Sequence, residues 1–151
     1  MGEQVWNGCV FPDDVLYDVE RNVWVRMEGD EAVLGMTDVA QTIGGKLVQI
    51  SFKPVGRRVA RGKPLAVIES AKWVGPFPTP LTGELITSNR AAFDLDMAVV
   101  NRDPYGSGWL VRVRPEDLEA DLALLVDGAT AFERYRAMLD DRDIRCFRCA
   151  D

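Results

Sequence analysis

Short segments that alternate apolar and polar residues, separated by turns rich in glycine and proline, make up most of this chain before residue 115. Such alternation is typical of half-buried β-strands, and glycine and proline supply the turns between them. The expected strands are residues 23–27, 31–36, 46–52, 65–68, 83–87 and 109–114. We therefore predict a mainly β protein, folded as a β-sandwich or flattened barrel.

Helical patterns occur at two places in the sequence. Thr37 is a suitable N-cap for a short helix that Gly44 and Gly45 would end, and its apolar positions are residues 36, 39, 40 and 43. Pro115 stops the last predicted strand. Beyond it, a C-terminal helical segment is indicated by two apolar faces, residues 118, 122 and 125 and then residues 132, 135 and 139.

Composition narrows the range of functions. The length of 151 residues suits one domain, and the net charge of −6 argues against nucleic acid as a partner. Histidine is absent, so the commonest general acid/base and metal ligand are missing, and we assign no catalytic residue and no metal site. No apolar run is long enough for a membrane span, and the N-terminus does not read as a signal peptide, so we expect a cytoplasmic protein.

One lysine is placed in an unusual setting. Lys72 lies in the segment Ile68-Glu69-Ser70-Ala71-Lys72-Trp73-Val74, which we predict to form the tip of a β-hairpin, and Gly56, Gly62 and Gly83 flank it. Most lysines at hairpin tips only keep a protein soluble. A lysine that carries a cofactor must also be exposed on a stiff backbone, and this setting provides both. Acylation would turn its ammonium into a neutral amide, so the cofactor would do the chemistry.

The segments around this lysine resemble those of lipoyl domains, and most closely the H protein of the glycine cleavage system. The central motif is Ile68-Glu69-Ser70-x-Lys72, and the similarity covers roughly residues 11–115. Further matching segments are residues 24–26, 35–41, 55–65, 80–84 and 101–110. The resemblance implies a lipoyl/biotinyl-type barrel-sandwich hybrid with lipoate in amide linkage to Lys72. Biotinyl domains usually have methionines beside the lysine, whereas this chain has Ala71 and Trp73, which favours lipoate.

The chain departs from H proteins in four places. Asn22 stands where H proteins usually carry a histidine, and residues 73–78, 89–101 and 145–151 are atypical. These features are similar to the H-protein-like lipoate-binding proteins of bacterial sulfur oxidation, which act with a heterodisulfide-reductase-like complex. The resemblance implies one carrier domain over residues 1–151, with an N-terminal extension (1–20), a lipoyl core (21–114) and C-terminal helices with a cysteine-containing tail (115–151).

Four other residues are candidates for the site. Glu69 is the carboxylate close to the lysine in sequence, and it either helps a ligase choose Lys72 or is an ordinary solvated strand residue. Cys146 and Cys149 form a C-x-x-C pair that either exchanges with the lipoyl group or belongs to a frayed tail. Cys9 could approach this tail if the chain termini meet.

The leading interpretation is a non-catalytic carrier, lipoylated on Lys72, that shuttles sulfur intermediates in the cytoplasm. The resemblance implies as partners a lipoate-protein ligase or lipoyl transferase, the heterodisulfide-reductase-like complex and, as an additional candidate, dihydrolipoamide dehydrogenase. The alternative within this class is a glycine cleavage H protein that carries an aminomethyl group. Two other classes stay open: an unmodified interaction domain, and a thiol oxidoreductase that uses Cys146 and Cys149.

Overall fold

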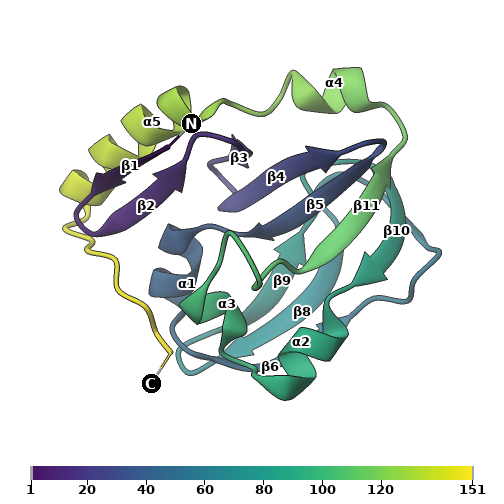
Figure 1. The fold of residues 1–151 in the computed structure, drawn as a ribbon, viewed down its shortest axis with the longest axis horizontal. Coiled ribbons are helices and arrows are strands. Elements are labelled where there is room, and N and C mark those ends of the chain that lie inside the picture. Colours follow the sequence, from purple (N-terminus) through teal and green to yellow (C-terminus); the bar gives the residue numbers. More distant parts are fainter. Residues whose placement is uncertain (1, 151) are drawn as a thin grey trace.

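The computed structural model describes residues 2–150, so Met1 and Asp151, the ends of the predicted carrier domain, lie outside the described residues. Its largest sheet is antiparallel, with strand order β3-β4-β5-β11-β10-β7 (Figure 1). The strands are β3 (Leu16–Asp18), β4 (Val23–Glu28), β5 (Glu31–Met36), β7 (Arg58–Val59), β10 (Gly83–Ser88) and β11 (Val111–Pro115). The predicted strands at residues 23–27 and 31–36 are present as β4 and β5 and form a hairpin, with Val23 paired to Met36.

A second antiparallel sheet packs against the first and has strand order β6-β8-β9. Its strands are β6 (Leu47–Phe52), β8 (Pro64–Ser70) and β9 (Val74–Pro78). Apolar side chains from both sheets, among them Leu34, Leu65, Ile68 and Leu85, form one buried cluster between them. The molecule is thus an unclosed flattened sandwich, which confirms the predicted fold class.

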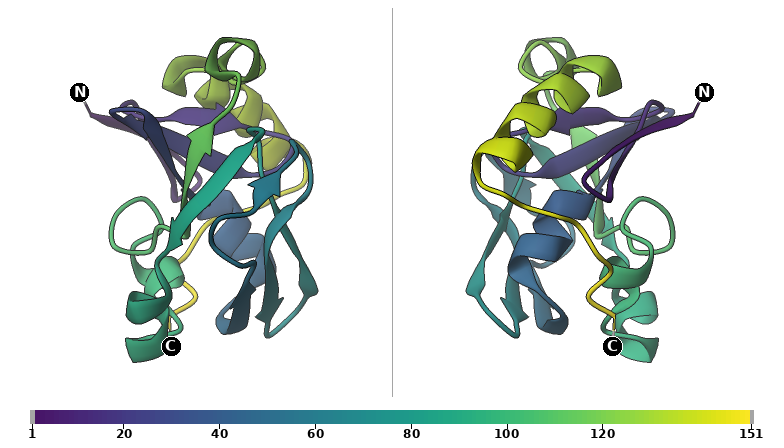
Figure 2. Two further views of the ribbon diagram at one scale, coloured as in Figure 1. Left: turned by 90° about the vertical axis from the view of Figure 1, so that its right-hand side faces the viewer. Right: turned by 90° about the vertical axis from the view of Figure 1, so that its left-hand side faces the viewer.

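The large sheet is also covered on its other face. Alternate residues of β4 and β5, such as Trp24 and Val33, point into a second cluster with Tyr135 and Leu139 of α5 (Gly128–Asp141). The hairpin of β1 (Glu3–Trp6) and β2 (Cys9–Pro12) adds Phe11 to this cluster. Figure 2 shows α5 and this hairpin on the side of the large sheet away from β8 and β9. The large sheet is therefore packed on both faces.

The remaining helices are short. Thr37 caps α1 (Asp38–Gly44), as expected, because its hydroxyl accepts a hydrogen bond from the amide of Ala40. The other three are α2 (Arg90–Leu95), α3 (Val99–Arg102) and α4 (Leu118–Leu122). The C-terminal helical segment is thus present as α4 and α5, while α2 and α3 lie in the connection between β10 and β11. None of the helices in residues 2–150 is long and apolar enough to cross a membrane.

Two local predictions were wrong. Pro76 and Pro78 predict a turn over residues 76–78, but these residues form the end of β9, an edge strand, where proline removes no hydrogen bond that the ladder needs. The last strand begins at Val111 rather than at Trp109, because the chain enters it from the tight turn that follows α3. Trp109 is only partly buried, whereas Val111 and Val113 face the core as expected.

Candidate functional site

Lys72 lies in the connection between β8 and β9, at the end of an antiparallel hairpin. The last paired residues are Glu69 and Val74, and the amide of Ser70 donates to the carbonyl of Trp73 at 2.7 Å. We call residues 70–73 the lysine turn. Lys72 itself is exposed. The predicted position of this lysine at the tip of a β-hairpin is therefore confirmed.

Hydrogen bonds fasten the lysine turn to residues 44–47, which we call the supporting loop. The hydroxyl of Ser70 donates to the carbonyl of Gly44 and accepts from the amide of Lys72 at 3.3 Å. The amide of Ala71 donates to the carbonyl of Lys46 at 3.0 Å. The backbone that presents the lysine is therefore held by the supporting loop as well as by its own strands.

Gly45 lets the lysine side chain lie close to the supporting loop. Its φ of +83° favours glycine, and a Cβ built there would be 3.3 Å from Cγ and Cε of Lys72. The aliphatic part of Lys72 thus runs over a glycine surface before its amine reaches solvent. A larger residue at position 45 would push the lysine away from this path.

A mostly apolar groove of about 560 Å³ begins at Lys72. It runs between the lysine turn, β9, α1 and the connection from β3 to β4. Its apolar lining includes Met36, Ala40, Ile43, Ile68 and Phe77. Asn22 also lines it. A flexible acyl chain attached to Lys72 could therefore fold back into a groove beside its attachment point.

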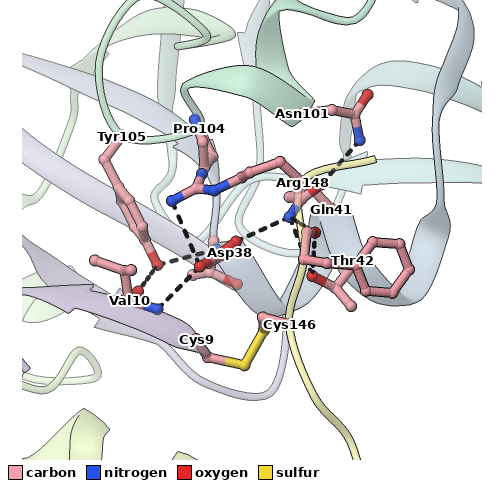
Figure 3. A network of polar contacts seen from close by, with 12 residues as sticks. Cys9, Val10, Asp38, Gln41, Thr42, Asn101, Pro104, Tyr105, Cys146 and Arg148 are labelled. Carbon is pink, nitrogen blue, oxygen red and sulfur yellow. Dashed lines mark hydrogen bonds and ion pairs between the residues drawn. A yellow bond between two sulfur atoms is a disulfide. The ribbon is translucent and has the colours of Figure 1, made fainter. Parts of the chain in front are cut away.

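Buried amide side chains support the loop under the lysine. Asn101 is 1% exposed and donates to the carbonyl of Gly45 and to Oε1 of Gln41, both at 3.1 Å. Its own side-chain oxygen accepts from the amide of Leu47 at 2.9 Å. Gln41, fully buried on α1, donates to Asp38 at 2.8 Å. Figure 3 shows the part of this network that joins Asn101, Gln41 and Asp38. Asn101 and Gln41 both fall in family-like motifs, but neither was predicted to have a role.

The cysteines pair differently from the predicted C-x-x-C unit. Cys146 forms a disulfide with Cys9, 137 residues away in sequence, so Cys9 does approach the C-terminal tail (Figure 3). Cys149 is a free, buried thiol. Burial raises the pKa of the Cys149 thiol, while the ammonium of Lys72 opposes that shift and the carboxylate of Asp38 adds to it. A redox role for the cysteines stays a prediction.

The other side chains near the lysine are divided between surface and core. Glu69 is exposed on β8, and its role in ligase recognition stays a prediction. Trp73 is 45% exposed beside Lys72, whereas Phe77 is buried, so one of these two aromatic residues is available to a partner. Tyr105 is buried, and its hydroxyl accepts from the amide of Asp38. Within residues 2–150, no group of three or more metal-ligating side chains comes together.

The fold and site define a class: small β-sandwich proteins that present one lysine on a hairpin for attachment of a cofactor. A family model, "Glycine cleavage H-protein", matches residues 15–139. The chain belongs to this family, whose members are non-catalytic carriers with lipoate attached covalently to a lysine.

Individual relatives agree with this assignment. "Glycine cleavage system H protein 3" of Aquifex aeolicus is 44% identical over 148 residues, covering 95% of this chain and 91% of the relative. "Probable glycine cleavage system H protein 2" of Sulfolobus acidocaldarius is 38% identical, covering 93% and 95%. Among solved structures, a glycine cleavage system H protein from Mycobacterium marinum superposes with a TM-score of 0.69 at 30% identity, covering 82% of this chain and 98% of that one.

Proposed function

We propose that this protein is a carrier whose lipoyl group is joined by an amide to Lys72. The observation that carries the proposal is the exposed Lys72 amine at the end of a fastened hairpin, beside an apolar groove. A lipoate-protein ligase or lipoyl transferase would load it. Membership of a family of lipoyl carriers supports the same role.

The residues around Lys72 fit this cofactor. Gly45 leaves space along the lysine side chain that a Cβ would fill, and the groove next to it is lined mainly by apolar groups. Acylation removes the charge of the ammonium, which would otherwise resist contact with such a surface. When bound, the lipoyl group supplies a pair of sulfur atoms that alternate between a cyclic disulfide and a dithiol. The protein holds the attachment point in one orientation and shelters the arm between partners.

The cargo is the finer part of the proposal. We assign a sulfur-containing intermediate, passed to a heterodisulfide-reductase-like complex in the cytoplasm. Three similar proteins of Aquifex aeolicus are numbered 2, 3 and 5, so that organism has several H-type proteins, which one glycine cleavage system would not require. The replacement at Asn22 lies in the groove itself, where it can alter how the cargo is held.

The alternative cargo is an aminomethyl group in the glycine cleavage system, and the names of the relatives favour it. Glycine decarboxylase, aminomethyltransferase and dihydrolipoamide dehydrogenase would then be the partners. The fold and the lysine turn suit both cargoes equally, because both are carried on the same arm. Only the partner enzymes distinguish them.

Attachment can be tested by co-expressing the protein with a lipoate ligase and measuring its intact mass. We expect a lipoyl adduct on the wild type, none on Lys72→Arg, and an unchanged adduct on the matched control Lys46→Arg, which replaces an exposed lysine of the supporting loop. A wild type without the adduct would indicate an unmodified interaction domain. An adduct that persists in Lys72→Arg would also contradict the proposal.

The cargo can be tested with the loaded protein. We expect electron transfer from thiosulfate when it is combined with a heterodisulfide-reductase-like complex, and none with Lys72→Arg. Aminomethylation by glycine decarboxylase, without a sulfur-dependent reaction, would establish the alternative. Thiol oxidoreductase turnover that survives in Lys72→Arg would instead point to the cysteines.

A further inference from the structure

Residues 145–150, which we call the C-terminal strap, cross α1 after leaving α5. Figure 2 shows this segment passing beside α1 towards the end of the molecule where the chain finishes. The strap is fastened at its start, where Cys146 is bonded to Cys9 and its amide donates to the carbonyl of Asn7 at 2.9 Å. Gly8 allows this close approach, because a Cβ there would lie 2.7 Å from the carbonyl oxygen of Cys146.

Beyond the disulfide, polar contacts hold the strap to α1. The carbonyl of Phe147 accepts from Nε2 of Gln41 at 2.7 Å and from the hydroxyl of Thr42 at 3.1 Å. The amide of Cys149 donates to Oε1 of Gln41 at 3.2 Å. Arg148 adds an ion pair with the buried Asp38 at 3.6 Å. The strap has no regular secondary structure, so these contacts are what hold it against α1 and keep its Cys149 side chain buried.

The same glutamine connects the strap to the lysine site. Oε1 of Gln41 accepts from Asn101 as well as from Cys149, and Asn101 in turn bonds to Gly45 and Leu47 of the supporting loop. Ala71 of the lysine turn is bonded to that same loop through Lys46. A continuous series of hydrogen bonds therefore runs from the disulfide-fastened segment to the backbone under Lys72.

We propose that the Cys9–Cys146 disulfide is a redox-operated fastener, and that its reduction by a dithiol releases the strap, exposes Cys149 and loosens the supporting loop of Lys72. A thiolate of the dithiol attacks Sγ of the disulfide, and half-buried Cys146 is more accessible than fully buried Cys9. This first attack releases Cys9 as a thiolate, and the second thiol then attacks the reductant's sulfur in the mixed disulfide and releases Cys146 as a thiolate. The dithiol loses two electrons as it forms its own disulfide, and Cys9 and Cys146 take up two electrons and two protons.

Two measurements on the unlipoylated protein test this, so the result does not depend on the proposed carrier role. The first is the rate at which iodoacetamide alkylates Cys149, followed by mass spectrometry before and after treatment with dithiothreitol. We expect reduction to raise this rate by about tenfold or more, because the remaining contacts are individually weak. Cys146→Ser should show the fast rate without any reductant.

The second measurement is amide hydrogen exchange. We expect faster exchange after reduction in peptides that contain Leu47 and Ala71, and unchanged exchange in the reference strand β10. An alkylation rate of Cys149 that is the same in oxidised and reduced protein would overturn the proposal. So would unchanged exchange at Leu47 and Ala71, since the strap would then not be coupled to the lysine site. Faster exchange in β10 as well would mean global unfolding and would equally contradict a local fastener.

Discussion

Replacing Asn101 by leucine should show how much the lysine site depends on one buried side chain. Asn101 is 1% exposed and takes part in three hydrogen bonds within 3.1 Å. Asn101→Leu keeps the branching at Cγ, although leucine is larger, and it leaves the amide of Leu47 and the carbonyl of Gly45 without these partners. Each buried, unsatisfied backbone group costs about 1–3 kcal/mol. Oε1 of Gln41 loses less, because it still accepts from Cys149.

Summing the two backbone groups and allowing for the gain in apolar burial, we expect Asn101→Leu to lower the free energy of unfolding by about 3 kcal/mol. Equilibrium unfolding in urea measures this directly. The control is Gln49→Leu on the exposed side of β6, which should change the free energy by less than about 0.5 kcal/mol.

The variant should also act locally. Hydrogen exchange at Leu47 should accelerate more than exchange in β4 and β5, because Leu47 loses its direct acceptor. A loss of stability below about 1 kcal/mol would refute the reasoning, since it would mean that other groups or water replace the missing partners at little cost.

Other substitutions and a pH titration give further checks, each followed by urea unfolding. Thr37→Ala removes the cap of α1 and should cost about 1 kcal/mol, whereas Thr37→Ser should cost less. Gly83→Ala, whose Cβ would meet the backbone carbonyl of Arg114, should cost about 2 kcal/mol or more. Gly75→Ala should cost less than about 1 kcal/mol, because its Cβ would meet only a partly exposed indole that can move. Burial raises the pKa of three tyrosines, so their phenols ionise in the unfolded state at a lower pH than in the folded state. The free energy of unfolding should therefore not depend on these groups below about pH 10. Above that pH it should fall by up to about 1.4 kcal/mol per pH unit for each phenol. They are Tyr17, Tyr105 and Tyr135.

The parts of the fold that were predicted correctly have local signals in the sequence. The hairpin of β4 and β5, the cap at Thr37 and the lysine turn each depend on residues within a short stretch of chain. Alternation and turn residues are sufficient for such elements because their hydrogen bonds join near neighbours. Lys72 could therefore be placed at a hairpin tip without knowledge of the remaining contacts.

The parts that were missed depend on distant residues. Cys146 has a nearer potential partner in sequence, Cys149, and only the packing of α5 against the β1–β2 hairpin brings Cys9 to it instead. Asn101 and Gln41 are 60 residues apart, and each would pass for an ordinary surface amide in sequence. Periodicity carries no information about which buried polar side chains meet, so the support under the lysine turn was not predictable.

The prolines that follow the lysine are explained by the position of their strand, β9, at the edge of its sheet. β9 pairs with β8 and lies at the edge of its sheet, so its outer side could accept a strand from another molecule. Pro76 and Pro78 have no amide hydrogen to donate to such a strand, and an edge position tolerates them because the ladder to β8 remains. A carrier needs the end of this hairpin accessible to several enzymes in turn. If Lys72 is the attachment point proposed above, prolines that keep the edge from pairing preserve access to it, which gives a physical reason for a rigid segment directly after this lysine.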